Sequence, residues 1–297
     1  MTMKLPAFLL VLTALLAPHV SSRQAHSKRL TGVPNNPNVL GNALNFWTKL
    51  ETGGWDLTRG ATSGSISLPM PQKGPILIQP NATALVIIDM QNYFLHESLG
   101  GDPLGRAIVP TTINLLRAFR AAGMPVLWTN WGVTDFDIIN MPPSFIQGFS
   151  SDDTSLTSFG SEMGTVVVPE SDQSIAANST TPGPNITIDA GRKLTRGSWN
   201  AQPWGDLFTE QTEGVANGTD FYFNKNRLSG LWGPSTPLQT FLQDNSMTTL
   251  FFGGVNIDQS TTSPLFATQM VDYNVALDGW RTNSTGILPA LMNATKA

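Results

Sequence analysis

The chain has 297 residues, of which 40% are apolar and 13% charged, and its 17 basic and 21 acidic side chains give a net charge of −4. It contains no cysteine, which excludes disulfides, thiolate metal sites and a thiol nucleophile, and its histidines are His19, His26 and His96. The negative balance provides no basic surface for nucleic acid, and so few histidines argue against a metal centre and a Ser-His-Asp triad. The length allows one large domain or two small ones.

Residues 1–22 have the pattern of a secretory signal peptide. Lys4 precedes an apolar run over residues 5–17 that is too short to span a bilayer, and small residues follow it. The alternative is a buried N-terminal helix. Six N-glycosylation sequons agree with export, at Asn81, Asn178, Asn185, Asn217, Asn283 and Asn293. The sequence therefore predicts a secreted glycoprotein with no membrane span in the mature chain.

Residues 23–78 are predicted to form an N-terminal extension. From residue 30 onward this segment is rich in Gly, Pro, Asn, Ser and Thr, and it carries the aromatic residues Phe46, Trp47 and Trp55. We expect it to wrap around the rest of the chain and to dock through these rings. A disordered linker is the alternative, against which the three large aromatic residues argue.

Strands and helices alternate after the extension. Apolar and β-branched runs predict strands at 84–88, 125–129, 220–223 and 247–252, and helical spacing predicts helices at 111–122 and 238–244. This alternation is typical of a parallel α/β sheet. The polar stretch 152–189 is interpreted as an elaborated surface loop. After Phe252 we expect no further buried strand.

Candidate catalytic residues follow three of the predicted strands. Asp89 and Lys225 each end a strand, and Gly253 begins a segment that follows another. Ligands of open parallel sheets bind beyond the carboxyl ends of the strands, where a carboxylate and an ammonium group can transfer protons and stabilise charge. The alternatives are a helix N-cap for Asp89 and a surface position for Lys225. His96 is interpreted as structural or exposed, and the neighbouring Asp135 and Asp137 as solvated.

Several ordered motifs resemble the isochorismatase-like hydrolases. They are Val86-Ile-Ile-Asp-Met-Gln-Asn-Tyr-Phe94, Asn130-Trp-Gly132, Trp199-Asn200, Lys225-Asn-Arg-Leu-Ser-Gly-Leu-Trp-Gly233 and Gly254-Val-Asn-Ile-Asp-Gln259. The similarity is greatest to a long fungal branch of the family, whose extension carries elements like Asn45-Phe-Trp47 and Trp55-Asp-Leu-Thr58. It covers residues 41 to 280.

This resemblance implies a Rossmann-like three-layer sandwich with a mostly parallel sheet over residues 79–280, followed by a C-terminal tail over 281–297. It implies hydrolysis of an amide C–N or related bond in a small-molecule substrate, with secondary metabolism as one setting, and with no organic cofactor or metal. Assembly into a homo-oligomer is compatible with it. Asp89 would be the general acid or base and Lys225 the charge stabiliser. The implied substrate-binding residues are Trp131, Trp199, Asn200, Trp232, Gly254, Val255 and Asn256, with a cis peptide between the last two.

The sequence departs from the family where the nucleophile belongs. The family's cysteine directly follows Asp-Gln, whereas here Asp258-Gln259 is followed by Ser260. The segment Thr261-Thr-Ser-Pro264, which in relatives opens a later helix, comes at once. A parallel crossover needs a dozen or more residues besides its strand, so roughly 20–25 residues and one βα crossover are missing. Ser260 is then either a substitute nucleophile or a junction residue of a misdrawn gene. The competing interpretation is a true Cys-less variant, which would resemble the isochorismatases proper and hydrolyse a vinyl ether with an acidic Asp89 of raised pKa.

Three functional hypotheses follow from this departure. The leading one is an isochorismatase-family hydrolase with little or no amidase activity of the thioester type. The second is a non-catalytic descendant that binds a small molecule or a partner in the remaining pocket. The third is a product that does not fold stably, because an open sheet that lacks a crossover exposes apolar edges.

Overall fold

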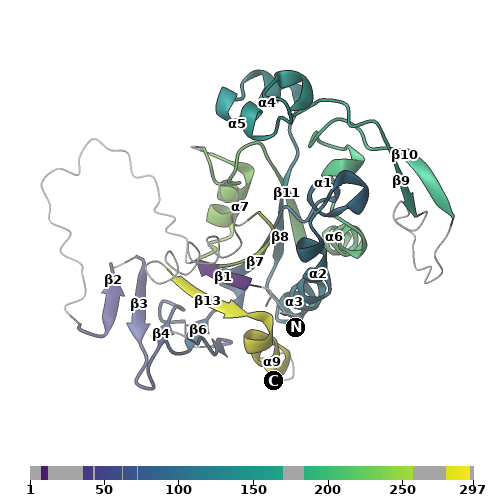
Figure 1. Ribbon diagram of the computed structural model, residues 1–297. Helices are drawn as coiled ribbons and strands as arrows, with labels where there is room; N and C mark the ends of the chain where they lie inside the picture. Colours follow the sequence, from purple (N-terminus) through teal and green to yellow (C-terminus); the bar gives the residue numbers. More distant parts are fainter. Residues whose placement is uncertain are drawn as a thin grey trace, which may run out of the picture.

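The computed structural model describes residues 8–12, 36–42, 44–61, 63–71, 73–169, 184–233, 235–256 and 279–294. Its centre is a sheet of six strands in the order β11-β8-β7-β12-β1-β13 (Figure 1). The first four of these run parallel to one another. They are β11 (Asp220–Lys225), β8 (Val126–Trp131), β7 (Thr83–Ile88) and β12 (Thr249–Gly254). The predicted mostly parallel α/β sheet is therefore confirmed.

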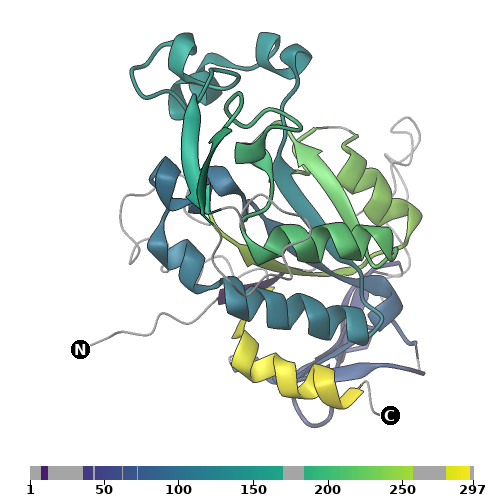
Figure 2. The ribbon, with the colours of Figure 1, turned by 90° about the vertical axis from the view of Figure 1, so that its right-hand side faces the viewer.

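Helices cover both faces of this sheet and complete three layers. On one face lie α3 (Val109–Ala121) and α6 (Asp206–Ala216), and on the other lies α7 (Pro237–Asp244) (Figures 1 and 2). The helix α3 buries Leu116 and Phe119 against the first face, at the helical spacing that the sequence shows. Strand β7 is buried on both faces, which explains its continuous apolar run.

The strand β1 (Phe8–Leu12) lies inside the sheet, between β12 and β13 (Gly279–Asn283). It runs antiparallel to both, with Leu10 opposite Phe252 on one side and Arg281 on the other. This strand belongs to the apolar run interpreted as a signal peptide. The expectation of no strand after Phe252 is wrong, because β13 forms there. The sequence Gly-Trp-Arg-Thr-Asn of β13 has no apolar run that would have indicated it.

The N-terminal extension forms a sheet of its own, in the order β2-β3-β4-β6-β5. Its strands are β2 (Val39–Gly41), β3 (Phe46–Lys49), β4 (Trp55–Asp56), β5 (Ile66–Leu68) and β6 (Ile76–Ile78). Trp47 packs against Trp55 and against Trp280 of β13, with ring centroids 6.1 and 5.0 Å apart. Docking through aromatic rings occurs as expected, but on a sheet rather than on a loose extension.

Short helices and a hairpin surround the carboxyl ends of the parallel strands. After β7 come α1 (Asn92–Leu95) and α2 (Pro103–Ala107), and after β8 come α4 (Asp135–Ile139) and α5 (Pro143–Gly148). The stretch 152–189, interpreted as a loop, contains an antiparallel hairpin of β9 (Thr165–Pro169) and β10 (Asn185–Asp189) in its described part. Its alternating buried Val166, Val168 and Ile188 explain these strands.

Single turns of 3-10 helix complete the connections, at Pro80–Ala82, Glu97–Leu99, Ser155–Thr157 and Trp199–Ala201. Residues 281–294, within the predicted tail, form the end of β13 and the helix α9 (Ser284–Ala294), which packs against α3 and β5 (Figure 2). Across the described ranges, no helix combines the length and the apolar character that a membrane crossing needs.

Candidate active site

A buried ion pair joins the ends of two strands of the central sheet. Asp89 follows β7 directly, Lys225 is the last residue of β11, and Lys225 Nζ lies 2.7 Å from Asp89 Oδ2. The side chains are 0% exposed for Asp89 and 2% for Lys225. Strand β8 lies between β7 and β11, and its last residue, Trp131, places its ring 4.7 Å from the ammonium group. The prediction that both groups meet at the carboxyl edge of the sheet is therefore borne out by the geometry.

Neither alternative for the two residues fits this arrangement. The helix after β7 is α1, and its N-cap is Gln91 rather than Asp89. Gln91 instead holds the end of β8, because its amide donates to the carbonyl of Trp131 and accepts from the Trp131 N–H, at 2.8 and 2.9 Å. Asp89 has a φ of 54°, a left-handed conformation that is uncommon outside glycine and that clusters at functional sites.

The end of β12 completes the pair. Asn256 Nδ2 donates a hydrogen bond of 3.1 Å to Asp89 Oδ2, the oxygen that Lys225 also contacts. Gly254 permits this close approach, since a Cβ at that position would lie 2.1 Å from the carbonyl oxygen of Ile88. The predicted cis peptide between Val255 and Asn256 is wrong: the bond is trans. Asn256 reaches Asp89 with a trans bond because its own φ is 65°.

Burial dominates the electrostatics of the pair. Desolvation raises the pKa of Asp89, and the attraction of Lys225 together with the hydrogen bonds from Lys225 and Asn256 opposes this rise. Desolvation also lowers the pKa of Lys225, against the attraction of Asp89. Asp89 Oδ1, in contrast to Oδ2, is buried without a hydrogen-bond partner. The two carboxylate oxygens therefore differ: Oδ2 is held by two donors, whereas Oδ1 is held by neither.

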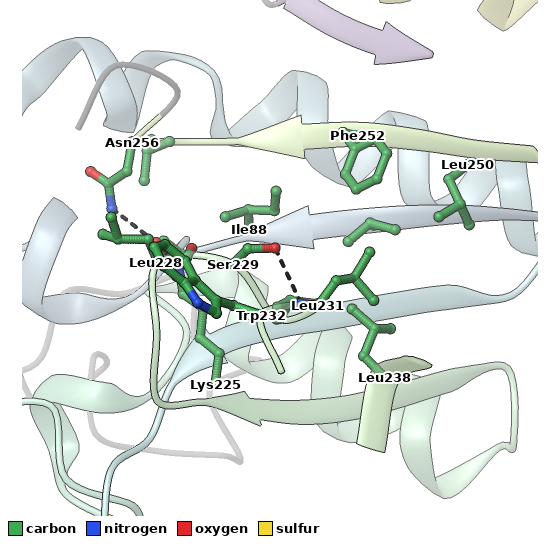
Figure 3. Close-up of a pocket in the computed structure, with 15 residues that line it drawn as sticks. Ile88, Lys225, Leu228, Ser229, Leu231, Trp232, Leu238, Leu250, Phe252 and Asn256 are labelled. Carbon is green, nitrogen blue, oxygen red and sulfur yellow. Dashed lines mark hydrogen bonds and ion pairs between the residues drawn. The ribbon is translucent and has the colours of Figure 1, made fainter. Parts of the chain in front are cut away.

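A pocket of about 400 Å³ opens at this pair (Figure 3). Its polar lining consists of Asp89, Lys225, Asn256, Thr129 and Ser229. The remaining lining residues are Gly230 and a set of apolar side chains: Val86, Ile88, Leu228, Leu231, Trp232, Leu238, Leu250, Phe252 and Val255. A concave, mostly apolar site with a few convergent polar groups is the usual form of a small-molecule site.

Comparisons with known proteins show the family of the chain. The family model described as "Isochorismatase domain" matches residues 83–278, a range that includes the pocket. The chain belongs to the isochorismatase family. It is 26% identical to the ureidoacrylate amidohydrolase RutB of Methylobacterium radiotolerans over 208 residues. The matched region covers 68% of this chain and 67% of that protein.

Solved structures with similarity to the chain include a cysteine hydrolase from Pseudomonas syringae pv. phaseolicola. It has 15% identity and a TM-score of 0.41, and the match covers 73% of this chain and 95% of that one. The yeast nicotinamidase Pnc1p bound to nicotinaldehyde has 13% identity and a TM-score of 0.31, and the match covers 55% of this chain and 70% of that one.

The residues predicted from the family motifs fall into two groups. Trp232, Val255 and Asn256 line the pocket, and Gly254 lies directly behind it. Trp131 does not line the pocket: its ring lies over Lys225 and among aromatic rings, and a backbone hydrogen bond from it lowers the pKa of Asp89. Ser260, the substitute nucleophile considered above, lies outside the described residues, as do Asp258 and Gln259.

Trp199 and Asn200 are not among the pocket residues. Trp199 packs edge to face against His96, with ring centroids 4.9 Å apart. The buried Asn200 stabilises a turn instead, because its Oδ1 accepts from the N–H of Leu194 and its Nδ2 donates to the carbonyl of Ala190, both at 2.7 Å. These two motif residues therefore have structural contacts in place of the predicted substrate contacts.

The remaining ionisable candidates have structural roles. His96 caps a 3-10 turn, and its Nδ1 accepts from the N–H of Ser98 at 3.2 Å. Asp137 forms a capping box with Thr134, whereas Asp135 is exposed and pairs with Arg192 at 2.7 Å. Within the described residues, no group of three His, Asp or Glu side chains could hold a metal ion.

Four of the sequon asparagines are exposed: Asn81, Asn185, Asn217 and Asn293. Asn283 is partly buried, and its Oδ1 accepts from the N–H of Gly286 in the first turn of α9. Asn178 lies outside the described residues.

Sequence reasoning missed two parts of the pocket. One is the part of the loop 228–232 that precedes Trp232, whose Leu228 carbonyl accepts a hydrogen bond of 3.0 Å from Lys225 Nζ. The other is Thr129 of β8, whose buried Oγ1 has no hydrogen-bond partner. Thr129 lies near the carboxyl end of a parallel strand, and this position could have indicated it. The loop lies within the family motif 225–233, which could have indicated its other residues as well.

Proposed function

We propose that the protein is a hydrolase of the isochorismatase family that cleaves an amide C–N or related bond of a small molecule by proton transfer at Asp89. The observation that carries this proposal is the unequal use of the two carboxylate oxygens. Lys225 and Asn256 both hold Oδ2, while Oδ1 is buried, unpartnered and part of a residue that lines the pocket. The amide class is supported by the name of the curated relative.

The arrangement supports hydrolysis by water. Asp89 accepts a proton from water at Oδ1 while the water oxygen bonds to the substrate carbonyl carbon. Thr129 lines the pocket and its hydroxyl has no hydrogen-bond partner, so it would donate to the resulting oxyanion. Asp89 then returns the proton to the nitrogen as the C–N bond breaks, which yields an acid and an amine. Lys225 and Asn256 stabilise the carboxylate throughout, and its raised pKa suits both steps.

This route differs from nucleophilic catalysis because the chain has no cysteine. No thioester forms, so we expect slow turnover. The lack of a thiol also favours a second candidate function, in which the pocket binds a small molecule without cleaving it. Binding that persists without turnover in the wild type would identify this second function.

The test measures acid and amine release by the purified full chain on a panel of amides that includes ureidoacrylate. We expect slow release that is lost in Asp89→Asn, because the variant cannot accept the proton. Asp135→Asn is the matched control, since Asp135 is exposed and does not line the pocket. No release from any amide, or equal release by Asp89→Asn, would overturn the proposal. An acyl-enzyme adduct detected by mass spectrometry would overturn the water route.

We also propose that the protein is secreted, glycosylated and active in secondary metabolism. The apolar run behind Lys4 and the sequons support export. The exposure of Asn81, Asn185, Asn217 and Asn293 leaves these side chains accessible to modification. Release of glycans by an amidase, followed by mass spectrometry of the secreted chain, tests this proposal.

A further inference from the structure

The pocket has a polar end and an apolar end. In Figure 3, Lys225 and Asn256 lie at one end, while Leu250 and Leu238 lie at the other, with Ile88 and Leu231 between them. All the ionisable lining residues are at the first end. The reacting bond therefore occupies only part of the pocket, and the rest can accommodate another portion of the same molecule.

The register of the sheet sets the floor of the apolar end. Ile88 pairs with Gly254, and Val86 pairs with Phe252 one row further from Asp89. Leu250 lies in the next row, and the side chains of these rows face α7. Each row adds about 7 Å, because two residues of a strand rise by that length. The floor thus extends away from the ion pair along β7 and β12.

The loop 228–232 forms the roof. Lys225 holds it through the carbonyl of Leu228 at 3.0 Å. Gly230 brings it close to the sheet, since a Cβ there would lie 2.6 Å from Thr129 and 3.2 Å from Leu238. Leu231 belongs to this loop, and its half-buried side chain lines the middle of the pocket. The catalytic lysine therefore also fixes the cover of the apolar end.

The far end is closed. Val86, Leu238 and Leu250 line the pocket but are only 1%, 4% and 1% exposed. A group that enters from the polar end must therefore stop where these side chains meet. The apolar end is a blind groove and accepts a chain of limited length.

We propose that the substrate is an amide with an unbranched apolar tail, which lies in this groove under the loop 228–232 while its polar end contacts Asp89 and Asn256. This inference rests on the proposed function. The loop 228–232 covers one side of this groove and the strands β7 and β12 form the other, so an unbranched tail can lie between them. The apolar lining shields the tail from water, so each added methylene that enters the groove strengthens binding until the groove is filled.

The test measures binding of linear primary amides, from acetamide to octanamide, by calorimetry. We use Asp89→Asn so that binding is observed without turnover. The dissociation constant should fall by up to about fourfold for each methylene and then level off, because burial of one methylene contributes about 0.8 kcal/mol. The variant Leu231→Trp fills the groove and should weaken binding of octanamide more than that of acetamide.

Leu104→Trp is the matched control, because Leu104 is 47% exposed and does not line the pocket. It should keep the dependence on chain length, and thermal melting shows that both variants are folded. Affinity that is independent of chain length, or the same chain-length dependence in Leu231→Trp, would overturn the inference. Chain-length-dependent binding without wild-type turnover supports the groove and overturns the hydrolase. Turnover without chain-length dependence supports the hydrolase and overturns the groove.

Discussion

Asn256 donates a 3.1 Å hydrogen bond to Asp89, and both residues have left-handed backbones, with φ of 65° and 54°. They follow two adjacent parallel strands, β12 and β7, whose last paired residues are Gly254 and Ile88. The left-handed conformation costs most L-residues roughly 1–2 kcal/mol, and asparagine and aspartate adopt it more readily because their short polar side chains form local hydrogen bonds. The fold therefore holds two uncommon backbone conformations side by side. One belongs to Asp89, whose Oδ2 accepts from Lys225, and the other to Asn256, which donates to the same oxygen.

The hydrogen bond and the backbone strain at Asn256 can be separated by two substitutions. In the native protein, the hydrogen bond from the Asn256 amide lowers the pKa of Asp89. Asn256→Gly and Asn256→Ala both remove this donor and therefore raise that pKa. Both should therefore shift the Asp89-dependent limb of the pH profile for hydrolysis to higher pH. Alanine alone should also lose about 1 kcal/mol of stability relative to glycine, because only alanine is strained at this φ. Urea unfolding measures this difference, and equal stabilities would contradict it.

Lys225→Met should show a pH-dependent loss of stability. Burial raises the pKa of Asp89, and loss of the ammonium group raises it further. The unfolded carboxyl titrates near its ordinary pKa of about 3.9 in both proteins, and the folded pKa is raised in both. The deficit relative to wild type therefore grows as pH rises above the folded pKa of the wild-type carboxyl, until the carboxyl of the variant also ionises. We expect a deficit of about 3–5 kcal/mol at neutral pH, because a buried charge loses its partner.

Urea unfolding of Lys225→Met between neutral pH and about pH 4 measures this deficit relative to wild type. The deficit should shrink on acidification, since the buried carboxyl is then neutral in the wild type and in the variant. Lys49→Met is the control, because Lys49 is exposed. A deficit that stays constant with pH would show that Lys225 acts through packing rather than charge.

A second buried charge cluster offers a matched pair of arginines. Arg120 of α3 donates to Asp220 at 2.8 and 2.7 Å and to Glu210, and Trp128 Nε1 donates to Asp220 at 2.7 Å. The Arg120 side chain is 16% exposed and that of Asp220 is 0% exposed. Arg120→Met should cost about 3–5 kcal/mol, because it leaves buried carboxylates without their partner.

Arg117 contacts the same Glu210, but its side chain is 65% exposed. Arg117→Met should therefore cost at most about 1 kcal/mol. Chemical denaturation of both variants gives the comparison. Equal losses would mean that burial does not determine the contribution of these ion pairs.

The central strands and the ion pair could be predicted from sequence because their signals are local and strong. The buried run before Asp89 and the position of Lys225 after another strand place both groups at one edge of a parallel sheet. The contact from Asn256 could not be predicted in the same way, since it depends on its φ of 65° and a trans peptide. The strands of the extension have two to four residues, which is too few for a periodicity to appear.

The apolar run near the N-terminus shows a different limit. The same leucines, together with Val11 and Phe8, suit both the apolar region of a signal peptide and an inner strand of a sheet. Pairing of Leu10 with Phe252 and Arg281 joins segments more than two hundred residues apart in sequence. Only tertiary structure distinguishes the two interpretations, since the antiparallel position between β12 and β13 has no local signal.

The placement of β1 predicts that residues 8–12 stabilise the folded domain. Leu10→Pro should destabilise the protein strongly, because proline cannot donate to the ladder and β1 has a neighbour on both sides. Leu10→Val is the control, since it keeps the apolar character and suits a strand.

A chain that begins at Arg23, as cleavage of the predicted signal peptide would leave it, lacks β1 and should be less stable than the full chain. Thermal melting and limited proteolysis of the three variants measure this loss. Equal stability of the full and shortened chains would show that the sheet does not depend on β1, and would remove the conflict between export and folding.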